Sequence, residues 1–182
     1  MISELPQRKP ARLTGFDYSS DGAYFVTVCT KNREMLFGNV GADPVSARSH
    51  GDHSALMIDC PASRIIERTF LETIAHFPGI SAPIYVVMPN HFHAIITIHV
   101  PEMYRADTGS APTLSKVMQS FKRYSTHEFI VAVKDGELPP FDGTVWQRSF
   151  HDHIIRNEND YRMIYSYIRD NPLNWMQDRF FI

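Results

Sequence analysis

A run of apolar and β-branched residues at positions 84–98 restricts the fold of this chain more than any other segment, because it contains His91 and His93 on either side of Phe92. The dipeptide at 89–90 divides the run into two strands, so the histidines stand at the start of the second strand. Side chains alternate between the faces of a strand, which projects both imidazoles from one face and turns Phe92 into the core. Such a pair can supply two ligands to a divalent metal ion, although the same alternation also arises by chance on a solvated face.

The rest of the chain shows strand and helix patterns in a definite order. β-Branched and aromatic runs predict strands, helical spacing of apolar residues predicts helices, and Gly, Pro and Asn mark the ends. We expect strands at residues 23–30, 84–88, 92–100 and 145–150, and helices at 63–77, from 113 onward and at about 158–170, with Ser63 as the first N-cap. This order matches an α+β, ferredoxin-like fold, with helices packed on one side of an antiparallel sheet.

The composition is that of one globular domain. With 182 residues, of which 43% are hydrophobic, the chain can bury a core without disulfides, and we expect one domain over 1–182 with a flexible insertion at about 38–56. Cys29 and Cys60 form no Cys-x-x-Cys pair and are expected to be reduced thiols. No signal-peptide pattern is visible, and no stretch reaches the roughly 18 apolar residues of a membrane span. We therefore expect a soluble, cytoplasmic protein with no membrane partner.

The formal net charge of −2 argues against a protein that coats DNA by bulk electrostatics, for which a pI above about 9 is usual. Any contact with nucleic acid would then be local. Basic residues that could make one gather near the N-terminus and on the expected helix after position 113, and they are Arg8, Lys9, Arg12, Lys116, Lys122 and Arg123. Scattered basic residues on a helix are also common on its solvated face, so both interpretations remain open.

The last expected helix carries three tyrosines and ends near Asn171. Tyr167 and Asn171 are four residues apart and share one face, whereas Tyr161 and Tyr165 share another face about 160° away. Most tyrosines in such helices are packing residues. An amide oxygen at Asn171, however, could join the two imidazoles around Mg²⁺ or Mn²⁺, which would place the phenol of Tyr167 one helical turn from the metal.

A phenol near a Lewis-acidic metal suits phosphoryl transfer. The metal would neutralise the non-bridging oxygens of a phosphodiester, and Tyr167 would attack the phosphorus to form a covalent phosphotyrosine. That intermediate preserves the bond energy for rejoining the strand.

Three motifs together resemble one known family. They are the segment Met88-Pro89-Asn90-His91-Phe92-His93, the upstream segment 22–30 with Arg33, and the downstream segment 146–157 followed by Tyr167 and Asn171-Pro172. This combination is similar to the single-tyrosine HUH transposases, and specifically to the REP-associated tyrosine transposases. The similarity extends over residues 16–175.

The resemblance implies an HUH nuclease fold that binds single-stranded DNA, often with an adjoining hairpin, and that cleaves and rejoins it through a 5′-phosphotyrosine. It implies a divalent metal, Mg²⁺ or Mn²⁺, held by His91, His93 and Asn171, with Tyr167 as the nucleophile. The protein would act as a monomer or a homodimer. Residues expected to contact DNA are Arg12, Lys116, Lys122, Arg123, Arg148, His153 and Arg156, although His153 is as compatible with a capping or packing role.

Two alternatives remain at this stage. The chain could be a single-stranded nucleic-acid-binding domain with the same fold and no chemistry. It could also be a metal-dependent phosphodiesterase that uses activated water, with the tyrosines serving only as packing residues.

Overall fold

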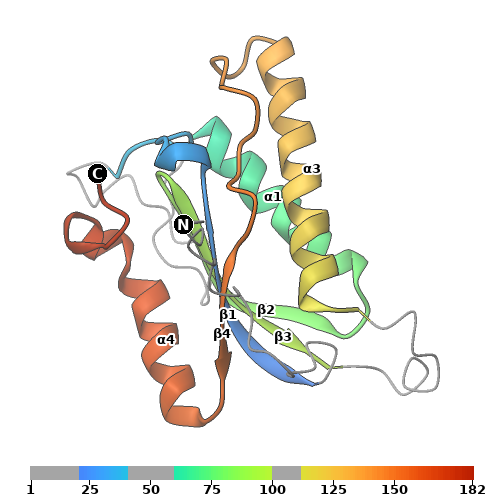
Figure 1. The fold of residues 1–182 in the computed structure, drawn as a ribbon, viewed down its shortest axis with the longest axis vertical. Coiled ribbons are helices and arrows are strands. Elements are labelled where there is room, and N and C mark those ends of the chain that lie inside the picture. The colour runs from blue at the N-terminus through green and yellow to red at the C-terminus, as the bar shows by residue number, and fades with distance from the viewer. Residues whose placement is uncertain (1–20, 41–59, 100–111) are drawn as a thin grey trace, which may run out of the picture.

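The computed structural model describes residues 21–40, 60–99 and 112–182, which form a four-stranded antiparallel sheet with helices on both faces (Figure 1). The strands lie in the order β2-β3-β1-β4, with bounds β1 (Gly22–Cys29), β2 (Ile80–Met88), β3 (His91–Ile98) and β4 (His151–Ile155). The helices are α1 (Pro61–His76), α3 (Leu114–Lys134) and α4 (Glu158–Asp170), with 3-10 turns η1 (Lys31–Arg33) and η3 (Pro172–Gln177). The predicted α+β class with an antiparallel sheet is confirmed.

The register of the strands places the two histidines in the centre of the sheet. Met88 and His91 face each other across the two-residue corner of the β2–β3 hairpin. On the next strand, Thr27 of β1 pairs with His93 on one side and with His151 of β4 on the other. Three strands therefore meet around the second histidine.

One apolar core lies between the sheet and the helices α1 and α3. Phe92 is fully buried there, with its ring centroid 4.7 Å from that of Phe70 on α1 and 5.2 Å from that of Phe121 on α3. The prediction that Phe92 points into the core, away from its two histidine neighbours, is confirmed.

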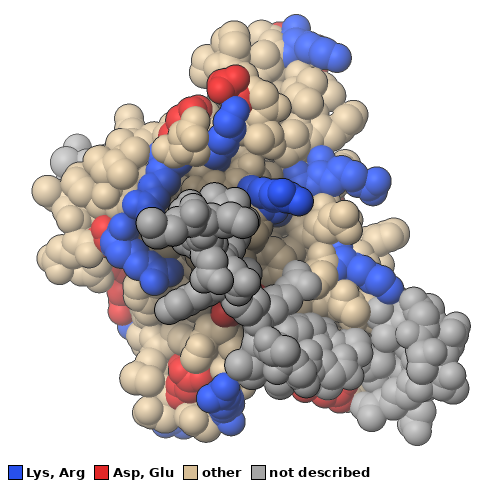
Figure 2. Space-filling view, viewed as in Figure 1, with Lys and Arg blue, Asp and Glu red and all other residues tan. Residues whose placement is uncertain are grey.

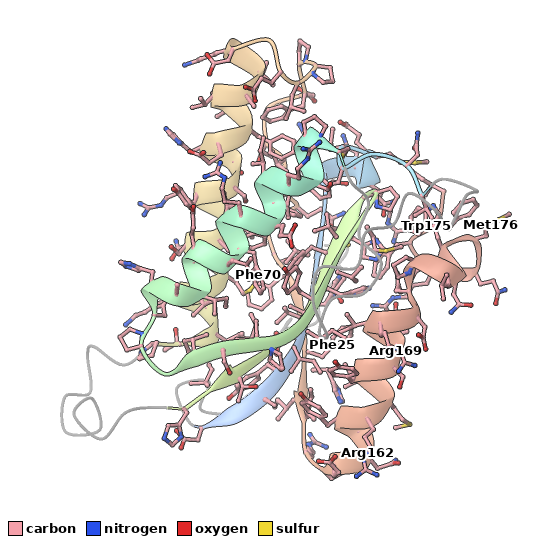
Figure 3. All side chains as sticks on the ribbon, turned by 180° about the vertical axis from the view of Figure 1, so that it is seen from behind. Phe25, Phe70, Arg162, Arg169, Trp175 and Met176 are labelled. Carbon is pink, nitrogen blue, oxygen red and sulfur yellow. The ribbon has the colours of Figure 1, made fainter. Side chains whose placement is uncertain are left out.

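A second core lies on the opposite face, under α4. Ile84 and Ile95 of the sheet pack there with Ile168 of α4 and with Trp175 and Phe180 of the C-terminal segment. Figure 3 shows Phe70 and Phe25 on opposite sides of the sheet, with Phe25 toward α4. This differs from the expectation that helices pack on one side only. Because β2 and β3 are apolar on both faces, the face that carries the histidines also needs a cover.

The prediction of a strand at 145–150 was wrong. The fourth strand begins only at His151, and the earlier segment touches the sheet through a single bridge between Trp146 and Thr30. Trp146 is buried and its indole nitrogen donates to Ser125 Oγ at 2.8 Å. A buried apolar loop and a strand share the same side-chain pattern, which is why the sequence suggested pairing here.

The boundaries of the first helix show how local chemistry sets its ends. Its N-cap is Cys60 rather than the expected Ser63, and the two side chains form a reciprocal capping box. The expected end of the helix near residue 77 is confirmed, since α1 ends at His76 with Phe77 as its C-cap. Gly79 follows with a φ of 77°, a left-handed conformation that favours glycine. Both cysteines are free thiols.

Arg12 and most of the segment 38–56 lie outside the described residues, as does the expected end of the third strand at position 100. Among the described helices, none is both long enough and apolar enough to cross a membrane.

Candidate metal centre

His91 and His93 form the centre of the site, at the start of β3. Both side chains are fully buried, with ring centroids 4.5 Å apart. The ring of Phe180 lies 4.6 Å from that of His91 and closes the site from the C-terminal side. Strand alternation thus puts both imidazoles on one face, as predicted, but in the interior of the molecule rather than at an exposed edge.

Hydrogen bonds fix the proton on the ring of His91. The amide nitrogen of Asn90 donates to the backbone oxygen of Phe180 at 2.8 Å, so the Asn90 side-chain oxygen faces Nδ1 of His91 at 2.9 Å. That oxygen is an acceptor, and Nδ1 must therefore carry the hydrogen. The lone pair is then on Nε2 of His91, a buried atom with no hydrogen-bond partner among the described residues. A buried, unpaired acceptor is the arrangement a metal ligand requires.

His93 is oriented in a similar way by its neighbours. Its Nδ1 lies 2.8 Å from Thr27 Oγ1, which leaves Nε2 on the side of α4. Burial lowers the pKa of His91 to about 3, with help from the positive charges of Arg179 and Arg33. Burial also lowers the pKa of His93 well below its ordinary value, as does the neighbouring His91. Both imidazoles are therefore neutral near pH 7, the form that binds metal ions.

Tyr167, Asn171 and Asp178 bring oxygen atoms to the same place. Asn171 caps α4 in a helical conformation, so it continues the face of Tyr167 one turn later. The Oδ2 atom of Asp178 accepts hydrogen bonds from the hydroxyl of Tyr167 at 3.0 Å and from the amide nitrogen of Asn171 at 2.8 Å. The Tyr167 hydroxyl is also 3.3 Å from Nε2 of His93. Burial and the charge of Asp178 raise the pKa of Tyr167 to about 12.

The residues fit a divalent cation. One potential ligand atom from each of His91, His93 and Asp178 lies within 4.8 Å of the other two. The side-chain oxygen of Asn171 is buried with no partner among the described residues, like Nε2 of His91. Two imidazole nitrogens, a carboxylate and an amide oxygen form a donor set that suits Mn²⁺ or Mg²⁺.

Asp178 was missed by the sequence reasoning. It follows α4 and the 3-10 turn η3, and only the fold of that turn returns it to the histidines. Its Oδ1 atom accepts a hydrogen bond from the backbone nitrogen of Phe180 at 2.7 Å, which fixes the carboxylate in place. No spacing rule links Asp178 to Tyr167, and a lone acidic residue after a helix gives little signal.

The basic residues expected to contact DNA are not brought together. Lys116, Lys122 and Arg123 lie on α3, on the far side of the sheet from the histidines. The ammonium of Lys122 donates to the backbone oxygens of Gln147 and Arg148, and burial lowers its pKa.

Near β4, Arg148 and Arg156 are exposed, and the backbone nitrogen of Arg156 donates to the carboxylate of Asp160. His153 Nε2 forms an exposed hydrogen bond of 3.0 Å with the same carboxylate. Of the predicted DNA contacts within the described residues, only His153 lines the cleft that adjoins the site.

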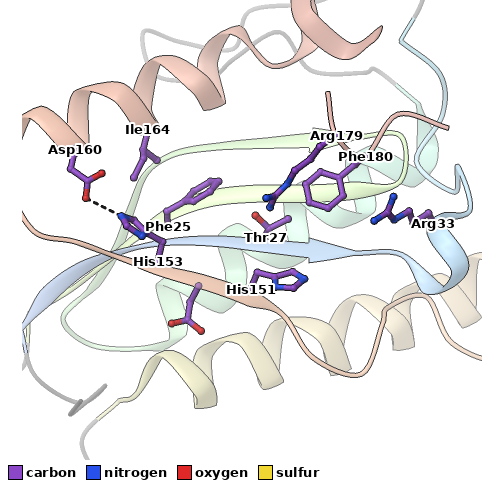
Figure 4. A pocket seen from close by; sticks show the side chains of 10 residues that line it. Phe25, Thr27, Arg33, His151, His153, Asp160, Ile164, Arg179 and Phe180 are labelled. Carbon is purple, nitrogen blue, oxygen red and sulfur yellow. Dashed lines mark hydrogen bonds and ion pairs between the residues drawn. The ribbon is translucent and has the colours of Figure 1, made fainter. Parts of the chain in front are cut away.

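This cleft, of about 630 Å³, runs between α4 and the face formed by β1 and β4. Figure 4 shows Arg33, Arg179 and Phe180 at one end, the His153–Asp160 pair at the other, and Phe25 between them. Figure 2 shows Lys and Arg side chains gathered on this face over η1 and the C-terminal segment. One end of the cleft is lined by Phe180, whose ring packs on His91, and by Arg33 and Arg179, which make that end positively charged.

Comparison with known proteins gives one relative in sequence and a fold match among solved structures. Models of known protein families give no match. A Haemophilus influenzae protein described as uncharacterised is 32% identical over 190 residues, covering 98% of this chain and 95% of that protein.

A solved structure of a REP-associated tyrosine transposase bound to a REP hairpin has a TM-score of 0.56 and 23% identity, over 90% of this chain and 74% of that chain. A Deinococcus radiodurans structure has 16% identity and a TM-score of 0.45, over 87% of this chain and 95% of that chain, too loose a match to support an argument. The chain therefore belongs to the same family as the Haemophilus influenzae protein, and it has the fold of a REP-associated tyrosine transposase.

Proposed function

We propose that this protein is a DNA transposase that cleaves and rejoins single-stranded DNA through a covalent 5′-phosphotyrosine at Tyr167. The observation that carries the proposal is the position of the Tyr167 hydroxyl, 3.3 Å from Nε2 of His93 and 3.0 Å from Asp178 Oδ2. The shared fold with a transposase that was solved with a REP hairpin supports the choice of DNA as substrate.

The residues that would hold the metal are His91, His93 and Asp178, with the free oxygen of Asn171 as a further ligand. When bound, a divalent cation supplies Lewis-acid stabilisation of the charge on the non-bridging oxygens of the phosphodiester. Asn90 fixes the neutral tautomer of His91 that has its lone pair on Nε2, and this lone pair would bind the metal. The two histidines are fully buried, whereas Tyr167 is 40% exposed and can be reached by a strand.

Tyr167 is the nucleophile in this scheme. Its hydrogen bond to Asp178 orients the phenol oxygen toward the site. A bond forms between that oxygen and the phosphorus as the phenol loses its proton, the bond from phosphorus to the 3′-oxygen breaks, and the 3′-oxygen takes up one proton and leaves as a hydroxyl, so that no net proton is gained or lost. Because one phosphodiester replaces another, attack by a 3′-hydroxyl reverses the step and rejoins DNA without an external energy source.

The test is trapping of the adduct on a labelled single strand. Suitable strands come from the DNA that flanks the gene and contain an inverted palindromic repeat, and they are incubated with Mn²⁺. We expect a protein–DNA adduct that survives SDS, and its loss in Tyr167→Phe. Tyr161→Phe and Tyr165→Phe are matched controls, because their rings stack on each other 6.2 Å apart on another face of α4.

Mass spectrometry of the trapped peptide identifies the modified residue. An adduct on Tyr161 or Tyr165 would overturn the assignment of the nucleophile. Released products without an adduct would indicate hydrolysis by activated water, and a mobility shift without either would indicate a binding domain.

A further inference from the structure

Two arginines from distant parts of the chain meet at the end of the cleft nearest the histidines. Arg33 ends the 3-10 turn after β1, and Arg179 lies in the C-terminal segment. Their guanidinium carbons are 5.5 Å and 4.6 Å from the centre of the Phe180 ring, and that ring covers His91. Figure 4 shows both arginine side chains at this end of the cleft.

Neither guanidinium has an ion pair with a carboxylate anywhere in the described ranges 21–40, 60–99 and 112–182. By contrast, Arg162 and Arg169 of α4 are paired with Glu158 and Asp170. Two exposed, unneutralised cations beside a buried site form an electrostatic recognition surface for an anion.

The backbone at Arg33 is held in an unusual conformation. Asn32 and Arg33 have φ angles of 55° and 59°, in the left-handed region that few side chains adopt. The one hydroxyl proton of Thr30 is shared between the backbone oxygens of Glu34 at 2.7 Å and Asn90 at 3.0 Å, and this contact fixes the turn. Conformations of this kind persist only where the surrounding structure holds them and they cluster at functional sites, and Arg33 here lines the cleft.

The middle of the cleft is aromatic. Phe25 is partly exposed there, and its ring lies edge-on to that of Tyr167 with centroids 5.9 Å apart. An exposed aromatic ring beside a cationic pocket is the combination that binds single-stranded nucleic acid, with bases stacked on rings and phosphates on cations. A volume of about 630 Å³ is within the roughly 300–1,000 Å³ of small-ligand sites.

We propose that this cleft binds the nucleotide next to the phosphodiester attacked by Tyr167, with Arg33 and Arg179 clamping the backbone phosphates and Phe25 stacking the base. The proposal deepens the proposed function and rests on it for the identity of the strand. It assigns DNA contacts to two arginines on the side of the sheet that carries the histidines, rather than to the basic residues of α3.

The clamp is tested by the salt dependence of binding. Fluorescein-labelled single strands are titrated with protein in EDTA, so that no cleavage occurs, at several salt concentrations. Removal of one cation that neutralises a phosphate should reduce the slope of log affinity against log salt by about 0.7. We expect Arg33→Ala and Arg179→Ala each to show this reduction and roughly tenfold weaker binding at low salt.

Two further variants serve as controls. Arg33→Lys keeps the charge and should retain most of the slope. Arg162→Ala removes an arginine from the side of α4 away from the sheet, paired with Glu158, and should change neither slope nor affinity (Figure 3). Thermal melting shows whether each variant is folded, and Arg179 is exposed, so its truncation tests the clamp even if Arg33→Ala does not fold.

Base stacking is measured with 2-aminopurine at the position next to the cleavage site. Its fluorescence should be quenched on binding the wild-type protein, and the quenching should be lost in Phe25→Leu. Tyr124→Leu removes an exposed aromatic ring from α3 and should leave the quenching unchanged.

The outcomes separate this proposal from the proposed function. Unchanged slopes in both alanine variants, or quenching that survives Phe25→Leu, would overturn the assignment of the cleft even if the wild-type protein forms an adduct. Arginine-dependent binding by a protein that forms no adduct would refute the transposase chemistry and retain the cleft as a single-strand site.

Discussion

Asn90 and His91 are neighbours in the chain, and the side-chain oxygen of Asn90 lies 2.9 Å from Nδ1 of His91. The other end of the same amide holds the backbone oxygen of Phe180 at 2.8 Å. One fully buried side chain therefore sets the tautomer of a proposed ligand and anchors the segment that closes the site.

Asn90→Ala should weaken metal binding without removing a ligand. It leaves Nδ1 of His91 unpaired and frees the ring to rotate, and loss of such an outer partner typically costs about 10–100-fold in affinity. Isothermal titration with Mn²⁺ measures the effect. Asn174→Ala is the control, because that exposed side chain donates to the backbone oxygen of Asp170 and to none of the proposed ligands. Equal Mn²⁺ affinity in Asn90→Ala and wild type would contradict the role of Asn90.

Asp178→Asn and Asn171→Ala should both lower the affinity for the metal. Excess Mn²⁺ should restore part of the adduct yield in both, because the loss of a ligand can be offset by mass action. Asp178→Asn is expected to have the larger effect, since it removes the carboxylate charge from a site with two neutral imidazoles. Titration of the adduct yield against Mn²⁺ distinguishes these variants from Tyr167→Phe, which no metal concentration should rescue. Rescue of Tyr167→Phe would show that another group is the nucleophile.

The metal-free protein should lose stability as the pH falls below 6.5. The pKa of His91 is about 3 in the folded state and 6.5 when unfolded, so between these values the unfolded state binds more protons. Stability is complete above pH 6.5 and declines toward pH 3 by about 1.4 kcal/mol per pH unit for each such histidine. Urea unfolding in EDTA at several pH values gives the slope.

The slope should be smaller in His91→Gln, which removes the contribution of His91, and unchanged in the control His76→Gln, which alters an exposed residue. An identical slope in His91→Gln and wild type would show that His91 is not kept neutral by burial.

Phe92→Ala should cost about 3–5 kcal/mol, the usual range for a large core aromatic. Its ring is fully buried against Phe70 and Phe121. Leu71→Ala on the outer side of α1, where the side chain is 46% exposed, should cost much less. Chemical denaturation of both variants gives the two free energies, and a loss below about 1 kcal/mol for Phe92→Ala would be inconsistent with this core.

Lys122→Met should destabilise the fold by about 1–3 kcal/mol, because two backbone oxygens lose a charged donor. Those oxygens belong to Gln147 and Arg148, just before β4. Arg123→Met, an exposed neighbour on α3, is the control. Weaker DNA binding at unchanged stability would instead assign Lys122 to the DNA interface, as its sequence position suggested.

The sequence predicted the parts of the site that local periodicity determines. Strand alternation around Phe92 gave the common face of His91 and His93, and helical spacing gave the shared face of Tyr167 and Asn171. Their burial and the contribution of Asp178 could not be predicted. Both depend on α4 and the C-terminal segment docking on the second face of the sheet, which is a tertiary contact with no local pattern.

The basic residues illustrate the same limit. The sequence shows which side chains are positively charged, but whether such a side chain already has partners within the protein depends on its neighbours in space. The ammonium of Lys122 is hydrogen-bonded to backbone oxygens. Arg33 and Arg179, in contrast, meet at the cleft from positions far apart in the chain.

The separation between the two halves of the site has a consequence for the order of folding. The β2–β3 hairpin, which carries both histidines, closes over two residues, whereas Tyr167 is 74 residues from His93. Loop-closure entropy makes the local pairing faster than the distant docking. We therefore expect the histidine strand to be in place before α4 arrives, so that the proposed cleavage activity is acquired last, when Tyr167 docks on the completed sheet.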